Sequence, residues 1–351
     1  YPSVSTYDMA IQERESDLVI GTFGRAIYVF DDIKPLRKAA ANNGNNFSKK
    51  LTVFPAPEAY MARYRPGPGY DWSSWGLYEG DNRGRGASYS FYIKPDTTKK
   101  AKADSALVKI YNQHNELIRT LKYKADTGFN RNNWGFEMNG IRQPGSPKPK
   151  PNAGEPRGQS VFPGTYKMVI TVGKESDSTM IVVNHDPTAP DSKEVYDAKV
   201  KMMERLDRST MRLTEVTDRL TEAEETIAKI EGQLKNEEGK AIDSLKKAGK
   251  AMTASIKSIR NFIFGKPQEK QGYGSPYQLT VNGTLSDARS EVLRKIKVPD
   301  QQEIRLATEA EQLVDEAVQK TNTFFNSKWE DYKKLVDNTP VSLFKPYKVI
   351  D

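Results

Sequence analysis

Residues 17–32 read DLVIGTFGRAIYVFDD, and this stretch decides how the rest of the chain is interpreted. Two apolar runs, Leu18–Phe23 and Ala26–Phe30, are separated by a Gly-Arg pair, a pattern that predicts a β-hairpin. Nearly every position in both runs is apolar, so both faces of the hairpin need cover, as in a blade stacked between neighbouring blades. A lone hairpin is unstable in water, so we expect the cover to come from residues upstream of Tyr1 or from another chain.

The composition and the start of the chain limit the classes of protein to which it could belong. A length of 351 residues predicts two or three domains. The chain begins at Tyr1 without an initiator Met, so we expect it to be the C-terminal portion of a larger secreted protein. No apolar run is long enough for a transmembrane segment, and the mean hydropathy is -0.72. The lack of cysteine excludes disulfides, thiolate metal sites and cysteine nucleophiles.

The middle of the chain has the pattern of an antiparallel β-sandwich. Residues 39–50, AAANNGNNFSKK, are small and polar and predict a linker or a long surface turn. The Pro-rich loop Ile141–Phe162 is expected to be exposed and mobile. About seven short strands split by turn residues predict an immunoglobulin- or fibronectin-like β-sandwich over residues 51–186. The candidate strands are Leu51–Phe54, Ala87–Ile93, Ala106–Tyr111, Leu117–Tyr123, Asn133–Glu137, Gly164–Val172 and Ser178–Asn184.

Residues 187–351 change to helical periodicity. Asp191 or Ser192 is a plausible N-cap for a helix of roughly forty residues with one apolar stripe. A second helix follows, ending at Gly265, then a short helix at Asp287–Ile296 and a final long helix after Pro299. Each stripe is narrow and the opposite faces are charged, so an antiparallel helical hairpin or bundle with coiled-coil character is expected.

The quoted stretch also resembles a known family. It is similar to the closing strands of sortilin-like β-propellers with bacterial-neuraminidase-type (BNR) repeats. The residues that match this pattern are Asp17, Leu18, Gly21, Thr22, Gly24, Arg25, Asp31, Asp32, Pro35, Leu36 and Arg37. Further segments that resemble the family, in the same order, are LTVFPAPEAYMAR, GDNRGRGASYSFYI, GFNRNNWGFEM and FPGTYKMVITVG, and, less sharply, SPYQLTVNGTLSDARSEV.

The resemblance implies a large exported bacterial protein, often labelled a glycosyl hydrolase because of its propeller. It assigns residues 1–38 to the last strands of a propeller blade and implies a location in the periplasm, on the outer-membrane surface or outside the cell. The Asp-box turns of the propeller repeats are absent from the sequence, so a ligand of the propeller's central channel cannot be located in it.

The charge and the chemistry-bearing residues do not predict a catalytic centre. The formal charge is +8, with basic residues in excess between Lys94 and Lys150. Because they are scattered along alternating strands, we expect a solvated basic surface and no nucleic-acid partner. The two histidines, His114 and His185, lie in turn-like sequence, so we expect neither a catalytic triad nor a metal site. No cofactor is expected.

Acidic residues give only weak signals of a site. The oxygen-rich segment Glu79–Gly84 lacks the regular spacing of a known calcium loop. Asp31 and Asp32 end a strand, and a turn followed by a cap is the favoured interpretation, ahead of paired carboxylates for glycosidase chemistry. Gly21 and Gly24 lie within the hairpin and form no dinucleotide-binding fingerprint.

The most suggestive cluster is aromatic. Tyr70, Trp72, Trp75 and Tyr78 lie in the Gly/Pro-rich connection RPGPGYDWSSWGLY. Such rings can stack on sugars or anchor a protein partner, and they can also fill the seam between propeller and sandwich, which we favour.

Two functions remain open from the sequence. The leading hypothesis is a non-catalytic structural and interaction module that braces an upstream propeller of the same gene product, or presents it to a protein or glycan partner at the cell envelope. The alternative is the accessory C-terminal region of a sialidase-like, glycan-active hydrolase whose active site lies upstream.

Overall fold

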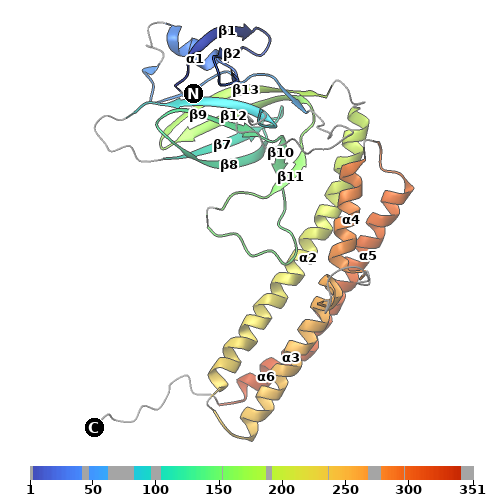
Figure 1. Ribbon diagram of the computed structural model, residues 1–351. Coiled ribbons are helices and arrows are strands. Elements are labelled where there is room, and N and C mark those ends of the chain that lie inside the picture. Colours follow the sequence, from blue (N-terminus) through green and yellow to red (C-terminus); the bar gives the residue numbers. More distant parts are fainter. Residues whose placement is uncertain are drawn as a thin grey trace, which may run out of the picture. The chain divides into compact units, whose positions relative to one another are not determined.

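The computed structural model shows a mixed β and α protein with a long helical C-terminal region (Figure 1). It divides into two compact units, one formed by Tyr1–Gly140 with Lys150–Asp191 and the other by Ile141–Pro149 with Ser192–Asp351. The residues that the structure describes are 3–41, 47–61, 83–95, 104–151, 153–186, 192–235, 237–267, 278–295 and 297–340. No helix among them is both long and apolar enough to cross a membrane.

The first unit opens with a three-stranded antiparallel sheet formed by β1 (Thr6–Gln12), β2 (Asp17–Thr22) and β3 (Ile27–Phe30), in that order. The hairpin predicted from the apolar runs is therefore confirmed as β2 and β3. Gly24 has a positive φ of 80°, which a glycine adopts without strain at the reversal. The sequence analysis did not predict β1, although its residues alternate between polar and apolar. A short helix, α1 (Lys34–Ala40), follows where a strand end and linker were expected.

Two larger sheets follow in the first unit. One has the order β5-β13-β12-β7-β8 and the other the order β4-β6-β9, and neighbours pair antiparallel except β5 and β13, which pair parallel. Their strands are β4 (Leu51–Val53), β5 (Ala59–Met61), β6 (Ala87–Ile93), β7 (Asp104–Tyr111), β8 (Leu117–Ala125), β9 (Gly128–Trp134), β12 (Gly164–Val172) and β13 (Glu175–His185). The predicted strands Ala87–Ile93 and Gly164–Val172 are confirmed to the residue.

Both large sheets contribute to one buried hydrophobic cluster. Its largest fully buried side chain is Trp134, whose ring contacts those of Phe136 and Tyr166 edge-on at 5.9 and 5.3 Å between centroids. The indole Nε1 donates to the Glu137 carbonyl oxygen at 2.9 Å, so the buried N–H is satisfied. The Tyr166 hydroxyl donates to the Phe162 carbonyl oxygen. These two hydrogen bonds tie the backbone at Glu137 and at Phe162 to buried side chains of the cluster.

The prediction of one continuous strand from Asn133 to Glu137 is wrong. β9 ends at Trp134, and Phe136 has a φ of 66°, a left-handed conformation that no strand can contain. The chain then forms β10 (Glu137–Asn139), which pairs with β11 (Arg157–Ser160). β11 lies within the loop predicted as Pro-rich and irregular. A strand is possible there because the four residues of β11 include no proline.

The second unit is built on the long helix α2 (Lys193–Leu234). The helices α3, α4 and α5 all contact α2, and α3 and α4 follow one another along it (Figure 1). Their apolar stripes join into one buried cluster that includes Leu206, Leu213, Leu220 and Ile227 of α2. The remaining helices are α3 (Lys240–Phe264), α4 (Val281–Arg294), α5 (Gln301–Phe324), a π-helical turn (Phe325–Trp329) and α6 (Glu330–Asp337).

Side-chain caps set the helix starts in this unit. The Ser192 hydroxyl accepts the Val195 N–H at 3.1 Å, which confirms one of the two predicted N-caps of α2. Thr280 caps α4 in the same way, so α4 starts earlier than the predicted Asp287. Asp300 caps α5, and Glu303 completes a capping box by accepting the Asp300 N–H at 2.8 Å.

A segment between β10 and β11 belongs to the second unit, and we call Ile141–Pro149 the strap. Its Arg142 guanidinium forms a two-pronged ion pair with Asp218 of α2, with one N–O distance of 3.0 Å. The Gly145 N–H donates to the Thr217 hydroxyl at 3.1 Å. Gly145 has a φ of 75°, so a side chain here would be strained. The strap is thus fixed by bonds to α2.

Candidate interaction surface

The β1–β3 sheet carries apolar side chains on both faces. Cross-strand register places Met9 opposite Ile20, and Ile20 opposite Tyr28, so these three share one face. Val19 and Val29 are paired on the other face. Met9 is 62% exposed and Val29 is 58% exposed. Other exposed apolar residues of the segment are Tyr7, Ile11, Phe23, Ile27 and Phe30.

Little within the described chain covers this sheet. Among residues 6–30, only Ser16 is buried. A three-stranded sheet needs a covered apolar face to be stable by itself, and contiguous exposed apolar patches mark interaction surfaces. Among the described residues, apolar side chains are therefore exposed on both faces of the sheet.

A charged junction joins this sheet to the β4-β6-β9 sheet of the same unit. The Arg83 guanidinium pairs with the carboxylates of Asp17 and Asp31, the latter at 3.2 Å. Burial opposes the charge on Arg83, yet the two carboxylates outweigh it and raise the pKa of Arg83. Arg131 of β9 donates to the main-chain oxygens of Asp31 and Asp32, the second at 2.7 Å. Asp17 and Asp31 therefore act here as ion-pair partners.

Asp32 has the turn-and-cap role that the sequence favoured. It has a φ of 42°, and its carboxylate accepts the Lys34 N–H at 3.2 Å at the start of α1. Its own N–H donates to the Asp17 carboxylate at 2.9 Å. Gly21 lies inside β2, as expected for a hairpin glycine.

The sequence analysis missed the two arginines of the junction. The bonds of Arg83 and Arg131 to Asp31 span 52 and 100 residues, so no local pattern could have indicated them. Phe47, within the predicted linker, was missed for the same reason. Its ring lies 4.3 Å from that of Tyr92 and anchors this stretch on β6.

The predicted binding aromatics lie outside the described residues. Tyr70, Trp72, Trp75 and Tyr78 all fall in 62–82, as does most of the oxygen-rich segment Glu79–Gly84. The prediction that these rings bind a ligand therefore stays a prediction.

The two histidines each form a local hydrogen bond in the first unit. His114 is exposed in the β7–β8 turn, where its N–H donates to the Asn112 side chain at 3.0 Å. His185 ends β13, and its Nδ1 lies 3.0 Å from the Asp186 carbonyl oxygen. Within the described ranges, no three His, Cys, Asp or Glu side chains are grouped so that they could hold a metal ion.

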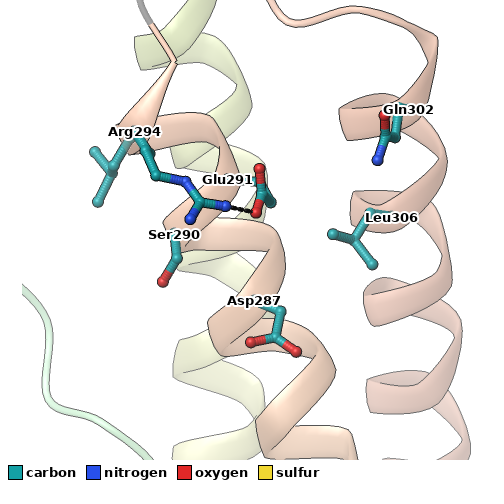
Figure 2. Close-up of a pocket in the computed structure, with 7 residues that line it drawn as sticks. Asp287, Ser290, Glu291, Arg294, Gln302 and Leu306 are labelled. Atoms are coloured by element: carbon teal, nitrogen blue, oxygen red, sulfur yellow. Dashed lines mark hydrogen bonds and ion pairs between the residues drawn. The ribbon is translucent and has the colours of Figure 1, made fainter.

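The second unit contains an open groove of about 720 Å³ between α4 and α5 (Figure 2). Glu291 pairs with Arg294 along its α4 side, and Leu306 contributes an apolar patch from α5 (Figure 2). The residues that line the groove are Asp287, Ser290, Glu291, Leu293, Arg294, Gln302 and Leu306. This lining offers hydrogen-bonding and charged groups, and the Glu291 carboxylate is already paired with Arg294.

Comparisons with known proteins leave the family open. No protein-family model and no curated protein matches the chain. A solved structure described as "Biofilm associated protein - BSP domain" is 11% identical over 50% of this chain and 19% of its own, with a TM-score of 0.18. Another, "pT26-6p", is 11% identical over 72% and 46%, with a TM-score of 0.10. The chain thus spans only a small part of the first structure, and at these scores neither likeness bears on fold or function.

Proposed function

We propose that this chain is a non-catalytic structural and interaction module of an exported β-propeller protein. In this proposal the β1–β3 sheet is the last part of a propeller blade, and the neighbouring blades come from the same gene product. The two units that follow brace the propeller or present it to a partner at the cell envelope, in the periplasm, on the outer-membrane surface or outside the cell.

The observation that carries the proposal is the sheet with two exposed apolar faces. Met9 on one face and Val29 on the other are each more than half exposed. A sheet on the outside of a domain has one apolar and one polar face, whereas a propeller blade is covered on both sides by the next blades. The resemblance of residues 17–37 to propeller-closing strands supports the same assignment.

The charged junction supports a bracing role. Arg83 and Arg131 hold the strand ends at Asp17 and Asp31 against the β4-β6-β9 sheet. Because these bonds reach main-chain oxygens as well as carboxylates, they fix the backbone of the β3–α1 connection. A blade held in this way would have a fixed orientation within the first unit.

We propose an immunoglobulin- or fibronectin-type β-sandwich for the two larger sheets. Three features support it: the strand orders β4-β6-β9 and β5-β13-β12-β7-β8, the parallel β5–β13 pair, and the single shared core. The Tyr166 hydroxyl bonded to the Phe162 carbonyl also fits the tyrosine corner of such folds. For the second unit, the shared stripe of α2, α3, α4 and α5 supports an antiparallel bundle.

Hydrogen exchange can test the proposed blade. We compare this chain alone with the whole gene product and expect slower amide exchange in β1–β3 in the whole protein, because neighbouring blades would cover both faces. Equal exchange in the two proteins would contradict the proposal.

Substitutions on the two faces sharpen this test. Met9→Asp and Val29→Asp should each lower the thermal midpoint of the whole gene product and change this chain alone far less, because the cover is missing there. Met211→Asp is the matched control, since Met211 is 58% exposed on α2 in the second unit. If only one face were sensitive, the sheet would have a single partner layer and would not be a blade.

A further inference from the structure

Helix α3 of the second unit carries a row of lysines on the side opposite its buried stripe. Leu245, Ile256 and Ile263 are fully buried in the bundle, whereas the lysines of the other side are exposed. A helix turns once every 3.6 residues, so residues 7, 10 and 17 positions after a given lysine lie on nearly the same side. We call the four lysines with this spacing, Lys240, Lys247, Lys250 and Lys257, the basic stripe, which is about 25 Å long.

The ammonium groups of the basic stripe have no acidic partners. α3 contains six cationic side chains and one acidic side chain, Asp243. Of these six cations, Arg260 is the one that forms an ion pair within the described part of the chain, with Glu224 of α2 at 2.8 Å. Neighbouring helices pair their charges across the bundle, as Arg205 of α2 does with Glu311 of α5 at 2.7 Å. The basic stripe therefore keeps an uncompensated positive potential at the surface.

The surroundings of the basic stripe offer charge but few groups for specific recognition. The hydroxyls of Thr253 and Ser255 donate to carbonyl oxygens one turn earlier in α3. Ala251 and Ala254, between the lysines, are small and exposed. Lys328 of the π-helical turn donates to the Ser255 hydroxyl at 3.4 Å, so it adds a cation beside α3. Such a surface can approach an anionic layer closely, but it has few free hydrogen-bonding groups with which to select a sugar.

We propose that the basic stripe binds the surface of an anionic lipid bilayer, with α3 along the surface and its ammonium groups among the lipid phosphates. Lysine clusters on one side of a helix are attracted to anionic headgroups. Single-stranded nucleic acid needs aromatic platforms, and α3 has no aromatic residue between Lys240 and Lys257. Protein interfaces are depleted in lysine, which disfavours a protein as the occupant. This inference rests on the second unit alone and does not depend on the proposed propeller.

The test is sedimentation of the complete chain with vesicles of phosphatidylcholine and phosphatidylglycerol in equal amounts, at low ionic strength. Vesicles of phosphatidylcholine alone are the neutral control, and a soluble polyphosphate is the competing probe. We expect the chain to bind only the anionic vesicles and to be released as salt is added. No binding to the anionic vesicles would overturn the proposal. Equal or tighter binding of polyphosphate at the same phosphate concentration would also overturn it, because the surface would then be one for a soluble polyanion.

A triple variant localises the site. Lys247→Gln with Lys250→Gln and Lys257→Gln should weaken binding to the anionic vesicles roughly a hundredfold, because each lysine near such a surface contributes about fivefold. The matched control removes the same charge from exposed lysines of the first unit. This control, Lys49→Gln with Lys94→Gln and Lys174→Gln, should change binding less than about twofold.

Equal losses in the two triple variants would mean that only net charge matters, and the proposal would fail. Glutamine and lysine have similar helix propensities, so we expect the thermal midpoint of the triple variant to stay close to that of the unchanged chain. If the triple variant were poorly folded, the double variant Lys247→Gln with Lys257→Gln should still lose at least about tenfold in vesicle binding. Unchanged binding by a folded double variant would contradict the assignment to α3.

Discussion

At the scale of single residues, Glu303 is the buried charge on which the α4–α5 connection depends. Its side chain is 1% exposed, and its carboxylate pairs with Lys295 and accepts the Asp300 N–H. Lys199 donates to the carbonyl oxygens of Leu293 and Lys295, where α4 ends. A buried carboxylate is tolerated only when it is paired in this way.

Replacing Glu303 should therefore be costly. We expect Glu303→Ala to lower the free energy of unfolding by about 2–4 kcal/mol, because it leaves the Asp300 N–H and the Lys295 ammonium without their partner. Urea unfolding measures the change. The control is Glu309→Ala, an exposed position of the same helix, which should change stability by less than about 0.5 kcal/mol. Similar values for the two variants would mean that the buried pair contributes nothing.

Asp300 gives a prediction about pH. The hydrogen bond from Lys297, then the bond from the Gln302 N–H, lowers the pKa of Asp300 below its ordinary value. Its pKa is thus lower in the folded than in the unfolded chain. The stabilisation is present above the unfolded value of about 4 and is lost as pH falls through the folded value.

Asp300→Asn keeps the capping oxygen but removes this titration. Below about pH 4, the stability of this variant should fall less steeply than that of the unchanged chain. Urea unfolding across the acid range measures both profiles, with the exposed Asp331→Asn as control. Parallel profiles for all three proteins would contradict the role given to Asp300.

At the scale of elements, the last helix changes its pitch where its largest rings lie. Phe324 is 4% exposed at the end of α5, whereas Phe325 and Trp329 in the π-helical turn are only partly buried. The Phe324 and Phe325 rings lie 5.1 Å apart and edge-on. The wider turn, with its i→i+5 bonds, shifts the apolar stripe. Trp329 then lies next to both rings, and Tyr332 lies next to Trp329.

The different burial of Phe324 and Phe325 predicts different losses of stability when each is replaced by alanine. Phe324→Ala should cost about 3–5 kcal/mol of unfolding free energy, because it leaves a cavity in the bundle. Phe325→Ala should cost only about 1–2 kcal/mol, because part of its ring is already in water. Thermal and urea unfolding of both variants measure the difference. A larger effect at Phe325 would mean that the helix lacks the π-helical turn.

Elements with strong periodicity were predictable from the sequence, and those set by distant contacts were not. Ala87–Ile93 is rich in aromatic and apolar residues and was predicted to the residue, and α2 shows its stripe over many turns. The break after Trp134 depends on the conformation of Phe136, which packs against Trp134 in the core. The two apolar runs of β2 and β3 led to the expectation that this hairpin needs cover, whereas β1 was not predicted. The junction of Arg83 and Arg131 depends on contacts between residues far apart in sequence.

At the scale of the whole molecule, the two units are interleaved in sequence. The chain leaves the first unit after Gly140, returns at Lys150 and leaves again after Asp191. The strap therefore precedes the last segment of the first unit, Lys150–Asp191, in sequence, and yet it is bonded to α2 through Arg142 and Asp218. A discontinuous unit of this kind has no single boundary at which the chain can be divided.

We expect such interleaving to make the protein tolerant of a break in its backbone. If the chain is cut once, between Asp186 and Ser192, the strap remains on the first fragment and its docking residues on the second. We expect the two fragments to stay together in size-exclusion chromatography, and Arg142→Ala with Gly145→Val to loosen them by removing the ion pair and straining the turn. Separation of the unsubstituted fragments would contradict this expectation. Together they would behave as a split protein, in which a loop of one half serves as the missing piece of the other.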